Sequence, residues 1–221
     1  MKNKSLIIFG AGEIAELAFF YFKKYSEYHI EGFTIDDEYI TQNKLLNLPI
    51  IQFTEISKKY PPRDFDFFVA LSYSKLNGIR KEKYENLKKL GYKLSSFVSP
   101  KATVLNDNIG DNCFILENNV IQPYVKIGNN VTLWSGNHIG HHSIIKDHNF
   151  ISSHVVISGG VTIDEQCFIG VNATIRDHIN IGEKSIIGAG AIILKDVDPN
   201  GLYIGQSAER SRVPSHKLKN L

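Results

Sequence analysis

The second half of the chain carries a repeat of six residues, and no other feature of the sequence restricts the fold as strongly. A large aliphatic residue recurs at every sixth position through fifteen consecutive hexads, from Ile109 to Ile193. The residue four positions later is usually small or β-branched, as at Cys113, Val131 and Ala173. A helix repeats every 3.6 residues and a strand every two, whereas a six-residue period is typical of a parallel β-helix. Three hexads then close one triangular coil, and stacked coils bury the aliphatic column.

The cysteines and the start of the chain indicate a cytoplasmic protein. Cys113 and Cys167 occupy equivalent hexad positions three coils apart. Because coils stack at about 4.8 Å, we expect their backbones to lie roughly 14 Å apart, whereas a disulfide needs Cα atoms within about 7 Å. Both are therefore predicted to be reduced core residues. The first apolar run, Leu6–Gly10, is too short for a signal peptide or a membrane span.

Composition excludes several classes of protein. The chain has 43% hydrophobic and 22% charged residues and a net charge of +2, as expected for a folded soluble protein and not for a disordered one. No basic stripe marks a nucleic-acid-binding surface. We therefore expect neither nucleic acid nor a membrane as a partner.

The first ~95 residues alternate strand-like and helix-like patterns, which favours a parallel sheet covered by helices. The expected strands are residues 5–9, 28–35 and 65–71, and the expected helices run from the turn at residues 10–15 to about Lys24, over 54–59 and over 78–90. We therefore divide the chain into two domains. Residues 1–97 are predicted to form a small Rossmann-like α/β domain, and residues 98–221 an all-β left-handed parallel β-helix with a C-terminal tail.

A glycine-rich turn follows the first expected strand. Gly10 and Gly12 are spaced with Ala15 as in the dinucleotide-binding fingerprint, and Asp36 ends the next strand. However, ~95 residues are only about half of a full dinucleotide-binding domain, and no hydride-transfer site is visible. The turn therefore indicates a nucleotide-containing ligand without indicating a dehydrogenase.

With these motifs together, the sequence resembles those of the bacterial acetyltransferases that act on nucleotide-linked amino sugars. This group contains the bacillosamine-pathway and perosamine N-acetyltransferases and the sialic acid O-acetyltransferases. The resemblance covers nearly the whole chain and rests on Ile8-Phe-Gly-Ala-Gly-Glu-Ile-Ala15, Gly32-Phe-Thr-Ile-Asp-Asp37, Phe97-Val-Ser-Pro-Lys-Ala-Thr-Val104, Ile139-Gly-His-His142, Ile187-Gly-Ala-Gly-Ala191 and Tyr203-Ile-Gly205.

The resemblance implies a reaction and an assembly. We expect acetyl-CoA to be the co-substrate of direct, metal-free N-acetylation of a nucleotide-linked amino sugar, a precursor of a cell-surface glycan such as lipopolysaccharide or O-antigen. A homotrimer with active sites between subunits is also implied.

The same resemblance assigns roles to single residues. His141 matches the family's catalytic histidine and is the expected general base, with the amide of Gly159 one coil above it at the thioester carbonyl. The expected acetyl-CoA contacts are His154, Gly159, Gly170, Ala189 and Gly190. The expected nucleotide-sugar contacts are Gly10, Gly12, Glu13, Ala15, Asp36, Asp37, Ser72 and Arg80.

Two positions depart from the family pattern. The family follows its catalytic histidine with an acidic residue, whereas this chain has His142, to which we assign a supporting catalytic role; a carboxylate raises the basicity of an imidazole more than a second imidazole does. The Val-Pro pair that usually follows the last glycine is Gln206-Ser207 here.

The other histidines are expected to be less important. The fourth hexad position points outward and holds His142, His148, His154 and His178. Of the histidines in the chain, His29, His148 and His216 are expected to be ordinary solvated side chains.

Three other functions fit parts of the pattern. O-acetylation of a free sugar such as a sialic acid is the nearest alternative. A γ-type carbonic anhydrase uses the same β-helix, but no two histidines of this chain are five residues apart, as its zinc site needs. A non-catalytic NAD-sensing or scaffold protein is favoured only by the replacement of the acidic residue by His142.

Overall fold

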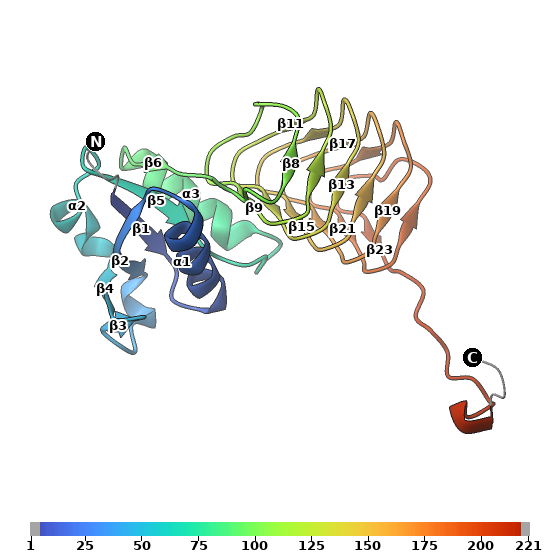
Figure 1. Cartoon of the computed structure of the whole chain (residues 1–221), viewed down its shortest axis with the longest axis horizontal. Helices are drawn as coiled ribbons and strands as arrows, with labels where there is room; N and C mark the ends of the chain where they lie inside the picture. Colours follow the sequence, from blue (N-terminus) through green and yellow to red (C-terminus); the bar gives the residue numbers. More distant parts are fainter. Residues whose placement is uncertain (1–4, 218–221) are drawn as a thin grey trace.

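The computed structural model describes residues 5–217 and consists of an α/β part beside a triangular β-prism (Figure 1). In the α/β part the strand order is β3-β4-β2-β1-β5-β6, and all neighbouring strands are parallel except the β3–β4 hairpin. The strands are β1 (Ser5–Phe9), β2 (His29–Ile35), β3 (Lys44–Leu45), β4 (Leu48–Gln52), β5 (Phe65–Val69) and β6 (Lys93–Leu94). The helices are α1 (Glu13–Tyr25), α2 (Ile56–Lys59) and α3 (Gly78–Lys89), with 3-10 turns η1 (Asp37–Tyr39) and η2 (Phe53–Glu55).

The predicted alternation of strands and helices is confirmed, but the β3–β4 hairpin and the short strand β6 were not predicted. β1 spans the predicted residues, and α3 ends one residue before the predicted end. The β3–β4 hairpin was not predicted, because its turn is made by Leu46 and Asn47, with φ of 49° and 66°, and not by the glycine that usually marks such a turn.

The prism is a left-handed parallel β-helix whose two-residue strands form three faces. The first face contains β7 (Phe97–Val98), β9 (Phe114–Ile115), β12 (Thr132–Leu133), β15 (Phe150–Ile151), β18 (Phe168–Ile169), β21 (Ile186–Ile187) and β23 (Leu202–Tyr203). The second face contains β8 (Thr103–Val104), β10 (Val120–Ile121), β13 (His138–Ile139), β16 (Val156–Ile157), β19 (Thr174–Ile175) and β22 (Ile192–Ile193). The third face contains β11 (Lys126–Ile127), β14 (Ile144–Ile145), β17 (Thr162–Ile163) and β20 (Asn180–Ile181). Beyond the prism the chain extends away to a 3-10 turn, η3 (Ser215–Lys217).

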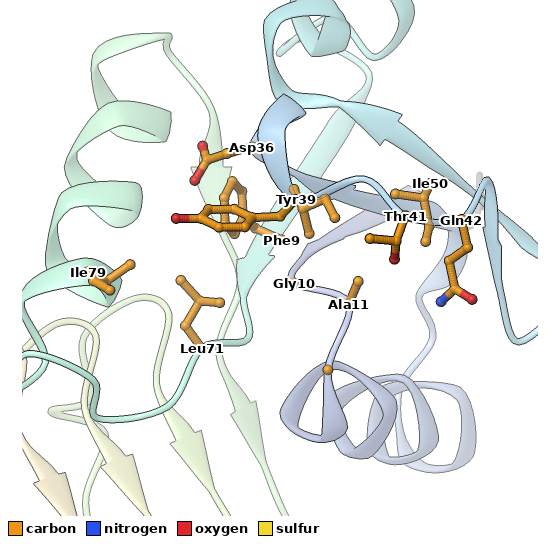
Figure 2. Close-up of a pocket in the computed structure, with 12 residues that line it drawn as sticks. Phe9, Gly10, Ala11, Asp36, Tyr39, Thr41, Gln42, Ile50, Leu71 and Ile79 are labelled. Carbon is orange, nitrogen blue, oxygen red and sulfur yellow. The ribbon is translucent and has the colours of Figure 1, made fainter.

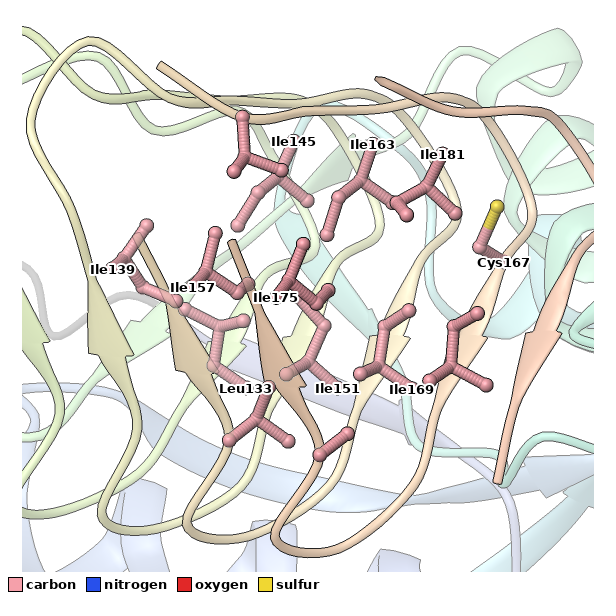
Figure 3. Packing of buried hydrophobic residues seen from close by; sticks show 14 of the residues in the cluster. Leu133, Ile139, Ile145, Ile151, Ile157, Ile163, Cys167, Ile169, Ile175 and Ile181 are labelled. Atoms are coloured by element: carbon pink, nitrogen blue, oxygen red, sulfur yellow. The ribbon is translucent and has the colours of Figure 1, made fainter. Parts of the chain in front are cut away.

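The aliphatic column predicted from the hexads forms the core of the prism. Figure 3 shows the isoleucines stacked in rows, and residues such as Ile139, Ile157 and Ile175 are completely buried. Cys113 and Cys167 are free and buried in the same core. Burial raises the pKa of the Cys113 thiol to about 12 and that of Cys167 to about 11, so neither is a thiolate nucleophile at neutral pH.

The fourth hexad position has a conformation that the sequence analysis did not use. His142, His148, His154 and His178 all have φ between 57° and 63°, in the left-handed region. Asparagine, histidine and glycine tolerate this region better than most residues, and asparagines occupy several equivalent corners of the prism. The abundance of histidine at this position therefore needs no catalytic explanation by itself.

The α/β part packs on the first face and on one edge of the prism. Phe68 contacts Phe114, with ring centroids 5.3 Å apart, and Tyr73 contacts Phe150 at 5.0 Å. Helix α3 follows the edge between the third and first faces, where Asn77 Nδ2 donates a hydrogen bond to Cys167 O over 2.9 Å. These contacts fix the α/β part against the prism.

Candidate functional site

A pocket of about 330 Å³ opens at the carboxyl ends of β1 and β2 (Figure 2). This is where open α/β sheets bind their ligands. Among the predicted residues, Gly10, Gly12 and Asp36 line it. The complete lining is Phe9, Gly10, Ala11, Gly12, Ile35, Asp36, Tyr39, Thr41, Gln42, Ile50, Leu71 and Ile79. Tyr39, Thr41 and Gln42 were not predicted, because they follow β2 without forming a recognisable motif.

The two glycines of the turn serve different purposes. Gly10 has φ of 132°, and a Cβ there would lie 2.6 Å from Ala70 O, so the fold itself requires glycine. Gly12 has φ of −103°, which any residue can adopt, and apart from Gly12 and its two chain neighbours no residue has an atom within 4 Å of the position of a Cβ. The absent side chain of Gly12 therefore leaves room on the pocket wall and is not explained by packing.

Asp36 is paired within the pocket. Lys83 Nζ, on α3, donates a hydrogen bond to Asp36 Oδ1 over 2.9 Å and another to Glu82 Oε1 over 3.0 Å. Burial alone would lower the pKa of Lys83, but these two acceptors raise it above its ordinary value, and the lysine stays charged. Asp36 is therefore held in place by α3.

Two of the predicted nucleotide-sugar residues do not reach the pocket. Ala15 is completely buried, and its Cβ lies 3.3 Å from where a Cβ of Gly10 would be. A small residue is needed there so that α1 can pack on the turn. The Asp37 carboxylate accepts hydrogen bonds from the backbone N–H and hydroxyl of Thr54 and so holds the start of η2. Neither Ala15 nor Asp37 lines the pocket, and their assignment as ligand contacts stays a prediction.

Arg80, also predicted as a nucleotide contact, lines neither this pocket nor the next one. The residue is 1% exposed, and its guanidinium donates to the carbonyl oxygens of Asn130 and Asn149, the latter over 3.1 Å. Burial lowers the pKa of Arg80 to about 10, so it remains charged at neutral pH. The residue anchors α3 to the prism. The expectation of a solvated His148 fails for the same reason, because His148 is 5% exposed and packs on Tyr84 at this edge.

A second pocket, of about 640 Å³, lies between the α/β part and the prism. It shares Gly12 and Leu71 with the first pocket. Its lining is Gly12, Glu13, Ile14, Leu17, Ala70, Leu71, Ser72, Tyr73, Ser74 and Trp134. Glu13 and Ser72, both predicted, therefore belong to this second pocket. Trp134 comes from the prism and was missed, because it occupies an ordinary outward hexad position.

His141 lies on the edge between the second and third faces, in the corner after β13. Its exposed ring stands beside Gly159, where a Cβ would lie 2.6 Å from Cε1 and 2.8 Å from Nε2 of His141. Its backbone N–H donates to Gln122 Oε1 over 2.8 Å. Within residues 5–217, no acceptor pairs with the N–H of Gly159. A histidine ring therefore lies against a glycine whose amide is free to bind a ligand.

His142 contacts the same ring. His141 Nδ1 and His142 Nδ1 are 3.1 Å apart, a hydrogen bond in which one nitrogen donates and the other accepts. The other side of the His142 ring packs on Tyr124, with centroids 4.7 Å apart. The prism thus places an imidazole where the resemblance expects a carboxylate.

The other predicted acetyl-CoA contacts lie on a different edge, between the first and second faces. His154, Ala189 and Gly190 are exposed there, and the His154 ring stands over Gly136. Gly170 is buried, and a Cβ there would lie 2.6 Å from Ala189 N, so packing between coils explains this glycine. The chain therefore separates His141 and Gly159 from the remaining contacts by the width of the second face.

Between residues 5 and 217, no group of three or more His, Cys, Asp or Glu side chains is arranged to hold a metal ion. None of the helices in that range is long and apolar enough to cross a bilayer.

Comparisons with known proteins agree with this architecture. Residues 108–141 and 124–159 match the family described as bacterial transferase hexapeptide (six repeats), and residues 160–195 match the hexapeptide repeat of succinyl-transferase. No curated protein matches the sequence.

Solved structures match both parts of the chain together. The acetyltransferase domain of PglB from Neisseria gonorrhoeae, in complex with acetyl coenzyme A, is 27% identical, with 90% of this chain and 94% of that one covered and a TM-score of 0.79. A histidine-to-asparagine variant of perosamine N-acetyltransferase from Caulobacter crescentus, with CoA and GDP-perosamine, is 20% identical, with 91% and 93% covered and a TM-score of 0.81. WeeI from Acinetobacter baumannii is 19% identical, with 91% and 97% covered and a TM-score of 0.78.

The last two structures are similar in fold, whereas the PglB domain is similar in fold and sequence over nearly its whole length. Because hexapeptide repeats span most of the prism and the two-part architecture is matched as a unit, the chain is a hexapeptide-repeat acyltransferase that is similar to the bacterial sugar acetyltransferases.

Proposed function

We propose that this chain is an acetyl-CoA-dependent N-acetyltransferase that acts in the cytoplasm on a nucleotide-linked amino sugar, a precursor of a cell-surface glycan. The proposal rests mainly on Gly12, which lies on the wall of both pockets. Neither its backbone conformation nor its packing requires a glycine, so the missing side chain leaves room for a ligand. Gly12 also caps α1 without a side-chain hydrogen bond, so the N-terminus of this 13-residue helix can face a diphosphate.

The acyl-transfer step assigns the chemistry to His141. The amine of the sugar attacks the thioester carbonyl of acetyl-CoA, and Nε2 of His141 accepts the proton that the amine loses. Collapse of the tetrahedral intermediate expels the CoA thiolate, which takes up a proton, and leaves the acetamide. The free N–H of Gly159 is suited to bind the carbonyl oxygen as negative charge develops on it. The juxtaposition of His141 and Gly159 supports these roles.

A trimer is the second part of the proposal, with the active site between copies. The α/β part of a chain covers the first face, and His141 lies on the opposite edge of the triangular prism. A single chain therefore keeps its own acceptor pockets away from its own base. Outward apolar residues on the second face, Val120, Val156 and Ile192, are exposed and suited to contact a neighbouring copy. Packing through this face would bring His141 and Gly159 of one copy to the edge of the next that carries His154, Ala189 and Gly190.

An acceptor screen tests the proposed function. Purified protein with acetyl-CoA is offered UDP-, dTDP- and GDP-linked amino sugars, and thiol release and the mass of the sugar product are measured. A free amino sugar and a free sialic acid serve as controls for recognition of the nucleotide and for O-acetylation. We expect an acetamide product from one nucleotide series. Thiol release with a free sialic acid alone, or with no acceptor at all, would contradict the proposal.

A further inference from the structure

The second pocket continues the first one toward the prism. The two pockets meet at Gly12 and Leu71, next to the N-terminus of α1. A ligand whose diphosphate sits at that terminus would extend its nucleoside into one pocket and its other substituent into the other. Of these two pockets, the second has a wall from the prism, where acyl transfer is proposed.

Trp134 is that wall, and its backbone is held firmly. The carbonyl oxygen of Trp134 accepts a hydrogen bond from the buried side chain of Asn119 over 2.9 Å and another from Asn137. Its N–H donates to Ile151 O over 2.9 Å. The indole lies beside Phe150, with centroids 6.3 Å apart. These bonds fix the backbone from which the indole projects, beside Phe150.

The lining of this pocket also includes polar side chains from the α/β part. Glu13 stands in the first turn of α1, and the hydroxyls of Ser72 and Ser74 lie 3.3 Å apart in the loop after β5. A pocket lined by an indole, a carboxylate and two hydroxyls suits a ligand with one apolar face and several polar substituents. A pyranose ring has this character, since its axial C–H groups form an apolar patch and its hydroxyls project outward.

We propose that the second pocket binds the hexose of the nucleotide sugar, with the indole of Trp134 packed against the C–H face of the ring and Glu13, Ser72 and Ser74 binding its polar substituents. This inference rests on the proposed acceptor. Trp134 then determines specificity for the sugar, whereas the first pocket determines specificity for the nucleoside. A prism residue therefore helps to orient the amine for acyl transfer.

The chain offers a direct readout, because Trp134 is its single tryptophan. The intrinsic fluorescence of the wild-type protein is titrated with GDP-perosamine and with UDP- and dTDP-linked amino sugars, and each is matched with its free nucleoside diphosphate. We expect the nucleotide sugar that is turned over to change the emission and to protect the indole from quenching by acrylamide. The corresponding nucleoside diphosphate, at saturation, leaves both unchanged. Equal responses to the two ligands, or no response to a nucleotide sugar that is turned over, would overturn the inference.

A substitution separates this role from a structural one. Trp134→Leu uses the side chain found one coil earlier, at Leu116, and should raise the KM for the nucleotide sugar about tenfold or more. It should leave the KM for acetyl-CoA and the inhibition constant of the nucleoside diphosphate unchanged. Phe20→Leu, at an aromatic residue that is 51% exposed on α1 outside both pockets, is the matched control. An unchanged KM for the sugar in Trp134→Leu rejects the inference while the proposed function stands. Absence of turnover with every nucleotide sugar rejects the proposed function itself.

Discussion

His141 Nδ1 and His142 Nδ1 are joined by a hydrogen bond of 3.1 Å. If Nε2 of His141 is to accept a proton, its Nδ1 must carry the hydrogen and donate it to His142. In the proposed mechanism this bond gives His142 the task of fixing the tautomer and orientation of the His141 ring, and the His142 ring itself is packed on Tyr124. The pair thus replaces the acidic partner of the family by a neutral acceptor, which leaves the imidazolium of His141 without a compensating charge.

The first prediction concerns the base. His141→Asn should lower kcat by about 10²- to 10⁴-fold, the usual effect of losing a general base. The fold should persist, because the ring lies outside the core, and the dissociation constant of acetyl-CoA should change little. Steady-state kinetics and calorimetry measure the two effects. A kcat close to that of the wild type would mean that another group is the base.

A second prediction separates His142 from His141. Asparagine tolerates the left-handed backbone at residue 142, where φ is 59°, and its carbonyl oxygen can accept the Nδ1–H of His141. His142→Asn should therefore keep most of kcat, whereas His142→Ala should lose about five- to tenfold, the worth of a ~1 kcal/mol hydrogen bond. Equal losses in the two variants would argue against this positioning role.

The glycine-rich turn provides a matched pair of substitutions. Gly12→Ala should leave the free energy of unfolding within ~0.5 kcal/mol of wild type but raise the KM for the nucleotide sugar, because the new methyl occupies ligand space. Gly10→Ala should destabilise the fold by about 1–3 kcal/mol, because its φ is 132° and its Cβ would meet Ala70 O. Thermal unfolding and kinetics distinguish them. Normal binding by Gly12→Ala would remove the main support for the acceptor site.

The proposed location of the active site between copies predicts complementation. His141→Asn lacks the base, and Gly12→Val should block the acceptor pocket, so each variant alone should be inactive. In a trimer formed by co-expressing both, about one quarter of the sites would combine an intact pocket with an intact His141 from the neighbouring copy. Recovery of about that share of wild-type activity is expected. A mixture as inactive as its components would place both functions within one chain.

Burial of His148 beneath α3 predicts that the stability of the fold depends on pH. Burial lowers the pKa of His148 to about 4, whereas in the unfolded chain it is about 6.5. Between these values the unfolded chain binds the extra proton, so the stability due to this site is complete above pH ~6.5 and is lost as the pH falls toward 4. His148→Asn, which suits the left-handed corner, should flatten this dependence in urea titrations between those pH values. A dependence as steep as that of the wild type would assign it to other groups.

The sequence alone determined the architecture. Fifteen hexads from Ile109 to Ile193 specify the prism, because a side-chain period of six leaves one way to bury the aliphatic residues. The strand over residues 5–9 and the glycine-rich turn after it predicted the position of the first pocket, because open α/β sheets bind ligands at the carboxyl ends of their strands. The spacing of 18 residues between His141 and Gly159 predicted their contact, since one coil of the prism contains 18 residues.

Only the tertiary structure decided what each candidate side chain faces. Arg80 and His148 read as exposed polar residues in the sequence, but the packing of α3 on the prism buries both. In the sequence, Trp134 is one of many outward hexad residues. In the structure it lines a pocket, because the α/β part lies beside it. Local periodicity fixes which way a side chain points from its own coil, whereas the surface that it meets comes from residues far away in the sequence, and no local pattern encodes that surface.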